Sequence, residues 1–387
     1  MARVMASLRL VATGCIMKLL IPGPVSTHPD VRAAMTRDFA PWDNDAKPMI
    51  ASVKDRVLAI AGGVPGEHVA LMLQGCGHYA IEASIRTFLP LGGRILIADT
   101  GPYAGRMIRL ASEAGRAVTV LPVAADRPVS PAAIAAALAD DPGISHVGII
   151  HSETGSGVIH DPTAIGAVVR ALGRRTIIDS VSAFGALPLG LADRPEIDAI
   201  VFSSNKCIEG VPGIAFVMSP VARLEACAGH AGSWSFDLTD IYQHGLKNLP
   251  GTFRFTPPMQ VIAAFSVALD RFDAEGGQPA RLARYTANMR VFYDGMIRLG
   301  LVPMLAPEHQ GPIVVNIHAP ADPAWNLLAF VDALKRRGFL ISNFYNTENP
   351  SFRVGCIGDI SPADMAEAVE MMALALADIG VGNRQAA

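Results

Sequence analysis

Residues 71–99 read LMLQGCGHYAIEASIRTFLPLGGRILIAD. The apolar run at 71–73 predicts a strand, the glycine turn at 75–77 ends it, and the apolar spacing that follows predicts a helix. A second apolar run over 94–98, closed by Asp99, predicts the next strand. The first N–H groups of a helix are unpaired and lie at the positive end of its dipole. The stretch therefore predicts a site for an anion, most simply a phosphate group.

The glycine turn admits two interpretations. Its letters match the G-x-G-x-x-A fingerprint of a dinucleotide site, with an acidic residue, Asp99, about twenty positions further on. The match is weak evidence, because the same strand, turn and helix can hold any phosphate and a dinucleotide fingerprint usually begins the sheet. The rest of the chain must decide whether the site holds NAD or another phosphorylated group.

The segments around this stretch alternate between strand and helix periodicity. Short β-branched runs are separated by helices of about ten residues, which is typical of a mostly parallel sheet covered by helices on both faces. We therefore expect an α/β fold with strands at 68–73, 94–99, 117–123, 145–152, 175–181, 198–205 and 213–219. The expected helices are 51–63, 80–90, 103–115, 131–141 and 162–173.

The pattern changes after Pro257-Pro258, where a long helical segment leads into a mixture of helices and strands. The sequence thus predicts a large domain over residues 18–260, with an N-terminal arm at 18–45, and a small α+β domain over 261–387. Residues 1–17 are expected to be an N-terminal extension, with a second possible translation start at Met17. Arg9 interrupts the apolar run of this extension, which argues against a signal peptide.

Composition narrows the class of function. Of the 387 residues, 51% are hydrophobic and 17% charged, and the net charge is −3. This suits a large core and small-molecule partners, and it gives no signal of nucleic-acid binding. No stretch approaches the roughly 20 apolar residues of a membrane span. The five cysteines are scattered without a C-x-x-C pair, so we expect no disulfide framework, no metal site and a reducing cytoplasm as the setting.

Two charged residues decide between the interpretations of the glycine turn. Asp179 ends the apolar run TIID, and Lys206 follows the next expected strand, 206 − 179 = 27 residues later. At the carboxyl edge of a parallel sheet, an acid and a lysine facing a phosphate turn match what pyridoxal phosphate requires. The lysine attaches the cofactor and the acid keeps its ring nitrogen protonated. Either residue alone could be a turn acid or a surface lysine, but their order and spacing favour pyridoxal phosphate over NAD.

Seven segments resemble those of class V (fold-type I) pyridoxal-phosphate-dependent aminotransferases, and within that family the 2-aminoethylphosphonate–pyruvate transaminases. They follow the family's order from about residue 18 to about residue 380. The segments are LLIPGPVSTHPDVRAAMTRDFAPWD, QGCGHYAIEA, HSETGSGVIHDP, IIDSVSAFGALP, SSNKCIEGVPGIAFV, GTFRFTPPMQV and SFRVGCIGDI.

The resemblance implies a role for each matching residue. Lys206 would be the cofactor lysine, Asp179 the partner of the ring nitrogen, and Arg353 the group that binds the acidic end of the substrate. The other implied cofactor contacts are Cys76, Gly77, His78 and Asn205 at the phosphate, Thr256 at the phosphate across a dimer interface, Val181 and Tyr103 on the two ring faces, and Thr154 at the ring hydroxyl. A homodimer with shared active sites is implied as well.

The resemblance further implies transfer of an amino group from 2-aminoethylphosphonate to pyruvate, giving 2-phosphonoacetaldehyde and L-alanine. Two departures leave the substrate open. Cys76 and His78 stand where the phosphonate enzymes usually carry serine and threonine, and this histidine resembles alanine–glyoxylate aminotransferases. The stretch 341–352 also differs from the phosphonate enzymes.

Three other functions therefore stay open. They are an alanine– or serine–glyoxylate aminotransferase, a pyridoxal-phosphate-dependent lyase acting on a hydroxylated aminophosphonate, and a catalytically silent cofactor-binding protein. The complete set of Lys206, Asp179 and Arg353 argues against the silent protein. Some relatives of this fold are cysteine desulfurases, but Cys356 lies in a tight G-C-I-G segment, so we expect a buried structural thiol there.

Overall fold

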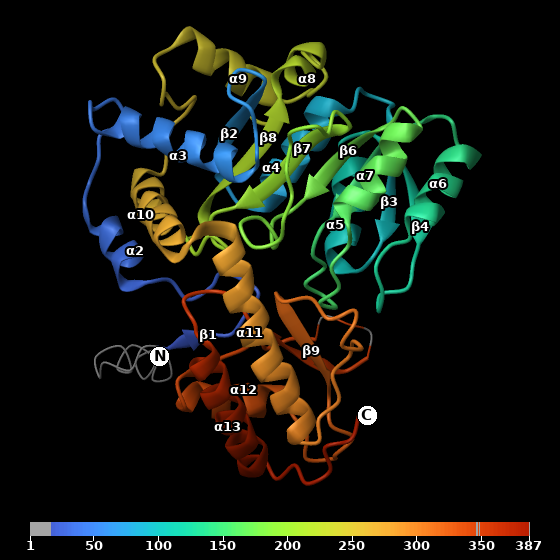
Figure 1. Cartoon of the computed structure of the whole chain (residues 1–387), viewed down its shortest axis with the longest axis vertical. Helices are drawn as coiled ribbons and strands as arrows, with labels where there is room; N and C mark the ends of the chain where they lie inside the picture. Colours follow the sequence, from blue (N-terminus) through green and yellow to red (C-terminus); the bar gives the residue numbers. More distant parts are fainter. Residues whose placement is uncertain (1–16, 346, 348, 387) are drawn as a thin grey trace.

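The computed structural model describes residues 17–345, 347 and 349–386, so all but the last residue of the expected extension lies outside the described residues. Within them, a seven-stranded sheet forms the centre of the larger part of the molecule, in the order β2-β8-β7-β6-β5-β3-β4 (Figure 1). Its strands are β2 (His68–Gly75), β3 (Arg94–Asp99), β4 (Ala117–Pro122), β5 (Ile144–Ile150), β6 (Arg175–Asp179), β7 (Ile197–Ser203) and β8 (Gly213–Pro220).

The sheet is mostly parallel, which confirms the expected α/β fold. β3 to β7 pair in parallel, whereas β8 runs antiparallel to both β7 and β2. Parallel neighbours need a crossover connection, but an antiparallel neighbour can follow after a short loop. The chain therefore returns from β7 into β8 through the loop at 204–212, and this loop carries Lys206 at the carboxyl end of β7.

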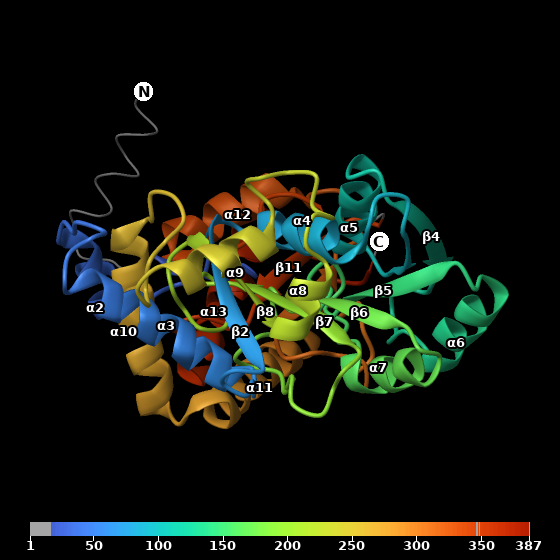
Figure 2. The same ribbon diagram turned by 90° about the horizontal axis from the view of Figure 1, so that it is seen from above.

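Helices cover both faces of the sheet (Figure 2). One face carries α3 (Ala46–Ile60), α6 (Pro131–Asp140), α7 (Pro162–Ala171) and α10 (Met259–Glu275). The other carries α4 (Gly77–Phe88), α5 (Pro102–Glu113), α8 (Val221–Ala226) and α9 (Leu238–Lys247). Because both faces are covered, the inner strands are mostly apolar instead of alternating regularly with polar residues.

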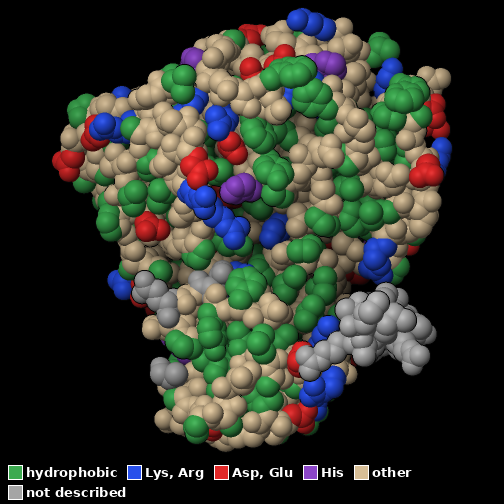
Figure 3. Space-filling view, turned by 180° about the vertical axis from the view of Figure 1, so that it is seen from behind, with side chains coloured by type: hydrophobic (Ala, Val, Ile, Leu, Met, Phe, Trp, Pro, Cys, Tyr) green, Lys and Arg blue, Asp and Glu red, His purple; other side chains and the backbone are tan. Residues whose placement is uncertain are grey.

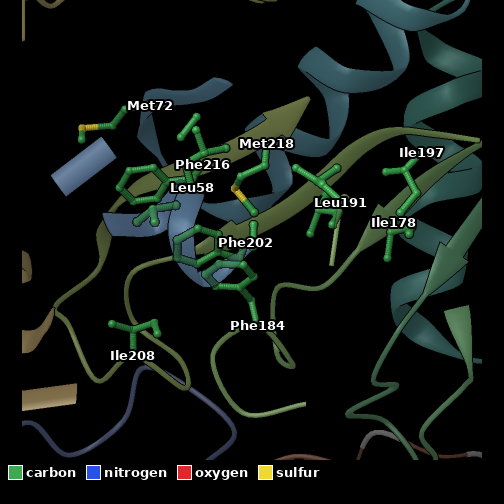
Figure 4. Close-up of a cluster of buried hydrophobic side chains, with 14 of the residues drawn as sticks. Leu58, Met72, Ile178, Phe184, Leu191, Ile197, Phe202, Ile208, Phe216 and Met218 are labelled. Carbon is green, nitrogen blue, oxygen red and sulfur yellow. The ribbon is translucent and has the colours of Figure 1, made fainter. Parts of the chain in front are cut away.

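Stacked aromatic rings lie at the centre of the core between the sheet and the helices α3, α6, α7 and α10 (Figure 4). Phe202 of β7 stacks on Phe184 with ring centroids 4.0 Å apart, and on Phe216 of β8 with centroids 4.8 Å apart. Phe184 lies in the turn that follows Asp179. The stack thus ties the end of β6 to the end of β7, the two places from which the expected charged pair comes.

The C-terminal part has its own hydrophobic core. Within the described residues it contains two two-stranded sheets, in which β9 (Val314–His318) pairs antiparallel with β11 (Ser351–Gly355), and β1 (Lys18–Leu19) pairs in parallel with β10 (Phe339–Leu340). The helices α11 (Gly277–Arg298), α12 (Leu327–Arg336) and α13 (Pro362–Asp378) pack around them. The start of the expected arm therefore joins the smaller part of the molecule.

The domain division at residue 260 stays a prediction, and the packing favours a later boundary. α10 shares the hydrophobic core of the large sheet with α3 and with the short helix α2 (Pro29–Ala33), which leads into a single 3₁₀ turn at Ala34–Thr36. α11 shares the core of the smaller part. Gly276, with a φ of +112°, lies between the two helices, and Gly277, with a φ of +69°, is the first residue of α11. We therefore propose the boundary at this point.

In the smaller part, strand β10 extends only over Phe339–Leu340, and Ser342 and Phe344 lie in irregular chain beside Arg353. In the part of the chain that the structure describes, no helix has both the length and the apolar character that a membrane crossing needs.

Candidate active site

Asp179 and Lys206 come together at the carboxyl edge of the sheet. Asp179 ends β6, and its neighbour β7 leads into the loop that carries Lys206. The turns after the two strands also touch, since the thiol of Cys207 donates to the carbonyl of Ser182 at 3.3 Å. Both charged side chains are buried, with exposed fractions of 6% for Asp179 and 8% for Lys206.

Burial sets the protonation of this pair. It raises the pKa of the Asp179 carboxyl to about 6, although the N–H of Val181, which donates to Oδ1 at 2.9 Å, and the charge of Lys206 both act to lower it. Burial also lowers the pKa of the Lys206 amine. A cationic ring nitrogen against Asp179 would stabilise the carboxylate, and a lysine of lowered pKa is readily deprotonated for nucleophilic attack.

The N-terminal arm closes one side of the lysine. Lys206 Nζ donates to the carbonyl of Pro22 at 3.0 Å. Gly23 has a φ of +136° and lies so close that a Cβ there would fall 2.4 Å from Nζ, so a glycine is required on both grounds. The same arm contacts β11, since Gly355 N donates to the carbonyl of Leu20 at 3.0 Å. The family resemblance includes this segment, but it implied no contact between the segment and Lys206.

The glycine turn lies at the N-terminus of α4, beside the turn that follows Asp179. A Cβ on Gly77 would fall 2.5 Å from Cγ2 of Val181, so the absence of a side chain lets the helix end approach. Cys76 is the N-cap, in extended conformation and without a capping bond from its side chain, and both Cys76 and His78 are exposed. Asn205, next to Lys206, is half-buried. This is the arrangement expected for a phosphate beside Asp179 and Lys206.

Arg353 on β11 reaches the same site from the smaller part of the molecule. It is 5% exposed. Its Nη1 donates to the carbonyl of Thr154 at 2.9 Å, its Nε donates to Ser342 Oγ at 3.2 Å, and its guanidinium lies 5.2 Å from the ring centroid of Phe344. Burial lowers the pKa of the guanidinium, but an arginine remains charged at any physiological pH. These contacts fix the orientation of its planar fork.

Tyr103, near the start of α5, completes this group. Arg106 lies over its ring, 4.8 Å from the centroid. Burial acts to raise the pKa of the Tyr103 phenol, but neighbouring groups that include the Lys206 and Arg353 cations outweigh it and lower the pKa. Figure 3 shows lysine, arginine and histidine side chains around a hollow between the upper and lower parts of the molecule.

Thr256 does not join this group within the chain. It is exposed and lines a surface pocket of about 580 Å³ together with Trp42, Leu249 and Phe255. Its expected contact with the cofactor of another subunit stays a prediction.

Two buried residues of the segment HSETGSG were missed by the sequence analysis. Glu153 accepts hydrogen bonds from Gly155 N at 2.8 Å and from Tyr103 N at 3.3 Å, so it joins the Thr154 turn to the start of α5. Burial raises the pKa of its carboxyl to about 7. His151 Nδ1 lies 3.1 Å from Ser180 Oγ, and burial lowers its pKa to about 3, so the ring is neutral. Both residues follow β5 at the same edge of the sheet as Asp179. This position after a strand could have identified them as candidate site residues.

Comparison with known proteins identifies the family. Residues 28–332 match the family described as aminotransferase class-V. The chain belongs to this family. A 2-aminoethylphosphonate–pyruvate transaminase of Burkholderia ambifaria is 42% identical over 367 residues, which cover 95% of this chain and 97% of the relative. A second one, of Polaromonas sp., is 43% identical over 94% of this chain and 97% of its own length.

Solved structures agree on the fold. The pyridoxamine–pyruvate aminotransferase from Mesorhizobium loti matches with a TM-score of 0.86 at 23% identity, covering 96% of this chain and 94% of that one. The alanine–glyoxylate aminotransferase from Nostoc sp. matches with a TM-score of 0.83 at 20% identity, covering 94% and 95%. This class V aminotransferase is a pyridoxal-phosphate-dependent transaminase of fold-type I, as the sequence predicted.

The residues of the site fit pyridoxal phosphate. The buried Oγ1 of Thr154 has no hydrogen-bond partner among the residues described, and a ring hydroxyl is a suitable partner for it. Gly77 lets the helix N-terminus lie against the turn that follows Asp179, and Lys206 and Asp179 supply a buried amine and a buried acid close to each other. The individual role of each side chain stays a prediction. Cys356 is fully buried and burial raises its thiol pKa, which suits a structural residue.

Proposed function

We propose that this enzyme transfers the amino group of 2-aminoethylphosphonate to pyruvate, giving 2-phosphonoacetaldehyde and L-alanine. Relatives named for this reaction are 39–43% identical to the chain over nearly its whole length. The observation that carries the proposal is the buried guanidinium of Arg353, which is held by Thr154 O and Ser342 Oγ near Lys206 and Asp179.

The protein residues have distinct tasks in this reaction. Pyridoxal phosphate supplies an electron-withdrawing ring that stabilises negative charge on the carbon next to the amine. Asp179 would hold the ring nitrogen of this cofactor in its protonated form. Lys206 would remove a proton from the amine-bearing carbon of the substrate, and its lowered pKa favours the basic form of the amine. Arg353 binds the phosphonate of the donor and then the carboxylate of pyruvate, because its planar fork pairs with either anion.

One observation favours an alternative substrate. His78 lies exposed at the N-terminus of α4, beside Gly77, and a histidine at this position resembles alanine–glyoxylate aminotransferases. The alternative is therefore an alanine– or serine–glyoxylate aminotransferase. A lyase acting on a hydroxylated aminophosphonate would use the same Lys206 and Asp179 but would need no keto acid.

We also propose a homodimer that works in the cytoplasm. The pocket around Thr256 is bordered by exposed apolar side chains, Trp42 at 76%, Leu249 at 66% and Phe255 at 45%. We call these three side chains and Thr256 the Thr256 patch. Exposed apolar surface of this kind favours association, and a second copy placed over it would bring Thr256 toward the partner's cofactor. The four described cysteines are free, which suits a reducing compartment.

A substrate panel tests the proposed function. The purified enzyme is offered 2-aminoethylphosphonate, alanine, serine and taurine, each with pyruvate and with glyoxylate. We expect 2-aminoethylphosphonate with pyruvate to give the highest kcat/KM. Preference for glyoxylate without turnover of the phosphonate would establish the alternative, and ammonia release without a keto acid would establish the lyase. Lys206→Ala is expected to lose both turnover and the visible absorbance of bound cofactor, and a coloured, active variant would refute the role of Lys206.

A further inference from the structure

A row of polar side chains on α11 lies where the two parts of the molecule meet. Arg281, Arg284, Tyr285 and Asn288 follow one another at helical spacing, so they share one face of the helix. Arg281 is 1% exposed, and Tyr285 and Asn288 are fully buried. None of these residues belongs to the active site described above.

This face of α11 holds the loop of Lys206 on one side. Tyr285 Oη donates to Glu209 Oε1 at 2.6 Å, and Arg284 Nη2 donates to the same oxygen at 2.7 Å. Arg281 Nη1 donates to the carbonyl of Cys207. Glu209 itself has a φ of +62°, a backbone conformation that is uncommon outside glycine and needs support from its surroundings.

The same face holds the chain that follows Arg353 on the other side. Gly358 N donates to Tyr285 Oη at 3.3 Å. Arg284 Nη1 donates to the carbonyls of Gly358 at 2.6 Å and Ile360 at 2.9 Å. Asn288 Nδ2 donates to the carbonyl of Cys356 at 3.0 Å. Because β11 ends at Gly355, these bonds fix the position of the strand that carries Arg353.

The chemistry of this junction indicates that it fixes the distance between the two parts more than it stabilises the fold. A buried ion pair loses much of its hydration, and apolar side chains of similar volume would stabilise a junction as well or better. The hydrogen bonds of Tyr285 and Arg284, by contrast, have fixed lengths and directions on both sides. The network therefore acts as a spacer between the Lys206 loop and the end of β11.

We propose that Tyr285, Arg284 and Glu209 are positioning residues that set the separation between Lys206 and Arg353, and thereby the length of the amino acid analogue that the enzyme accepts. The inference rests on the functions proposed above for Lys206 and Arg353. A substrate must present its reacting carbon to Lys206 while its anion pairs with Arg353. The separation of these two residues therefore determines which substrate length fits.

Tyr285→Phe tests the inference, with Tyr293→Phe as the matched control. Tyr293 is a buried tyrosine on the same helix whose hydroxyl donates to the carbonyl of Leu305 at 2.9 Å, so the control loses one bond to a backbone carbonyl but leaves the network intact. The holoenzymes are compared by their kcat/KM for 2-aminoethylphosphonate and for 3-aminopropylphosphonate, which is one methylene longer. The pH midpoint of the visible absorbance of bound cofactor is a second readout, independent of turnover.

We expect the wild type and Tyr293→Phe to prefer the shorter amine equally. Tyr285→Phe should reduce that preference roughly tenfold, through a higher KM for the shorter amine, and should shift the absorbance midpoint. If Tyr285→Phe yields too little protein, Arg284→Lys replaces it in the experiment. This variant keeps the charge but cannot reach Glu209, Gly358 and Ile360 together, so we expect it to reduce the preference for the shorter amine as well.

Two results separate the inference from the proposed function. If Tyr285→Phe lowers the melting temperature as Tyr293→Phe does, yet keeps the wild-type preference and midpoint, the network is only structural and the inference is overturned. If the wild type uses neither aminophosphonate, the proposed function is wrong. The length comparison is then made with the amine that the wild type does use and its next longer homologue. An unchanged absorbance midpoint in Tyr285→Phe would still overturn the inference.

Discussion

Asp179 combines a chemical role with an energetic cost. An aspartate titrates near pH 3.9 in an unfolded chain, whereas burial raises the pKa of Asp179 to about 6 in the folded protein. The folded state therefore binds the proton more tightly. The stability that this provides is fully present below pH 4 and is lost as the pH rises through 6. Above that pH the protein without cofactor keeps an ionised carboxylate in a buried site.

Asp179→Asn should relieve this cost in the cofactor-free protein. Asparagine keeps an oxygen that accepts from Val181 N, but it carries no charge. We expect the variant to gain up to about 3 kcal/mol over the wild type at pH 7.5 and much less at pH 4.5. Urea unfolding at the two pH values measures the difference. An equal effect at both would show that the carboxyl is not ionising in this range. With cofactor bound, the same variant should lose most of its turnover.

Arg353→Lys should weaken the binding of both substrates. A lysine keeps the positive charge but cannot donate to Thr154 O and Ser342 Oγ and still offer a planar fork to an anion. We expect KM for 2-aminoethylphosphonate and for pyruvate to rise roughly tenfold or more, with a smaller change in kcat. Arg109→Lys, at an exposed position on α5, is the control. Unchanged KM values would place the anion elsewhere.

At the residue scale, the position of a functional side chain is predictable from the sequence when the residue directly follows an apolar strand. Asp179 and Lys206 each follow an apolar run, so their meeting at the sheet edge was predictable. Glu153 stands in the same position after β5 but was missed, because its task is to bind backbone N–H groups and no cofactor chemistry draws attention to it. The carbonyl of Pro22 against Lys206 was not predictable, since it depends on the path of a distant arm.

At the scale of single elements, α4 depends on a residue without a side chain at its first position. Gly77→Ala would place a methyl group against Val181, in the turn that also holds the Asp179 carboxylate. We expect cofactor affinity to fall at least tenfold, with the fold retained, because the helix end must move away from the phosphate. Equilibrium dialysis of pyridoxal phosphate checks this.

Gly105→Ala provides the matched control for that change. Gly105 lies within α5, and a Cβ there meets nothing within 4 Å. Alanine favours a helix over glycine by roughly 1 kcal/mol, so this variant should bind cofactor normally and be slightly more stable. Equal losses in the two variants would show that the effect at Gly77 is not a matter of space.

The elements themselves followed the sequence closely where their periodicity was regular. The strand and helix runs between 68 and 220 all appear, with ends shifted by a few residues. The antiparallel direction of β8 was not predictable from its apolar run, since a strand buried on both faces looks alike in either direction. The place of α10 on the large sheet was also hidden, because its amphipathic pattern does not say which core it covers.

At the scale of the whole molecule, the Thr256 patch should hold two copies together. Phe255→Asp would place a charge in that apolar surface, and we expect it to shift the protein from dimer to monomer and to release cofactor on dilution. Sedimentation with absorbance detection follows both. Leu328→Asp, at a position on α12 that is 60% exposed, is the control and should leave the assembly unchanged. Monomers that keep their cofactor would defeat the proposed contact of Thr256.

The path of the N-terminal arm has a consequence for how the protein is made. Residues 18–23 leave the ribosome early, yet β1 pairs with β10, Leu20 accepts a hydrogen bond from Gly355 and Pro22 reaches Lys206. The partners at 339–355 are translated after all the strands of the large sheet. The large sheet has all its strands by residue 220 and can form during synthesis. Catalytic competence, in contrast, has to wait until residues 339–355 have emerged and packed against the arm.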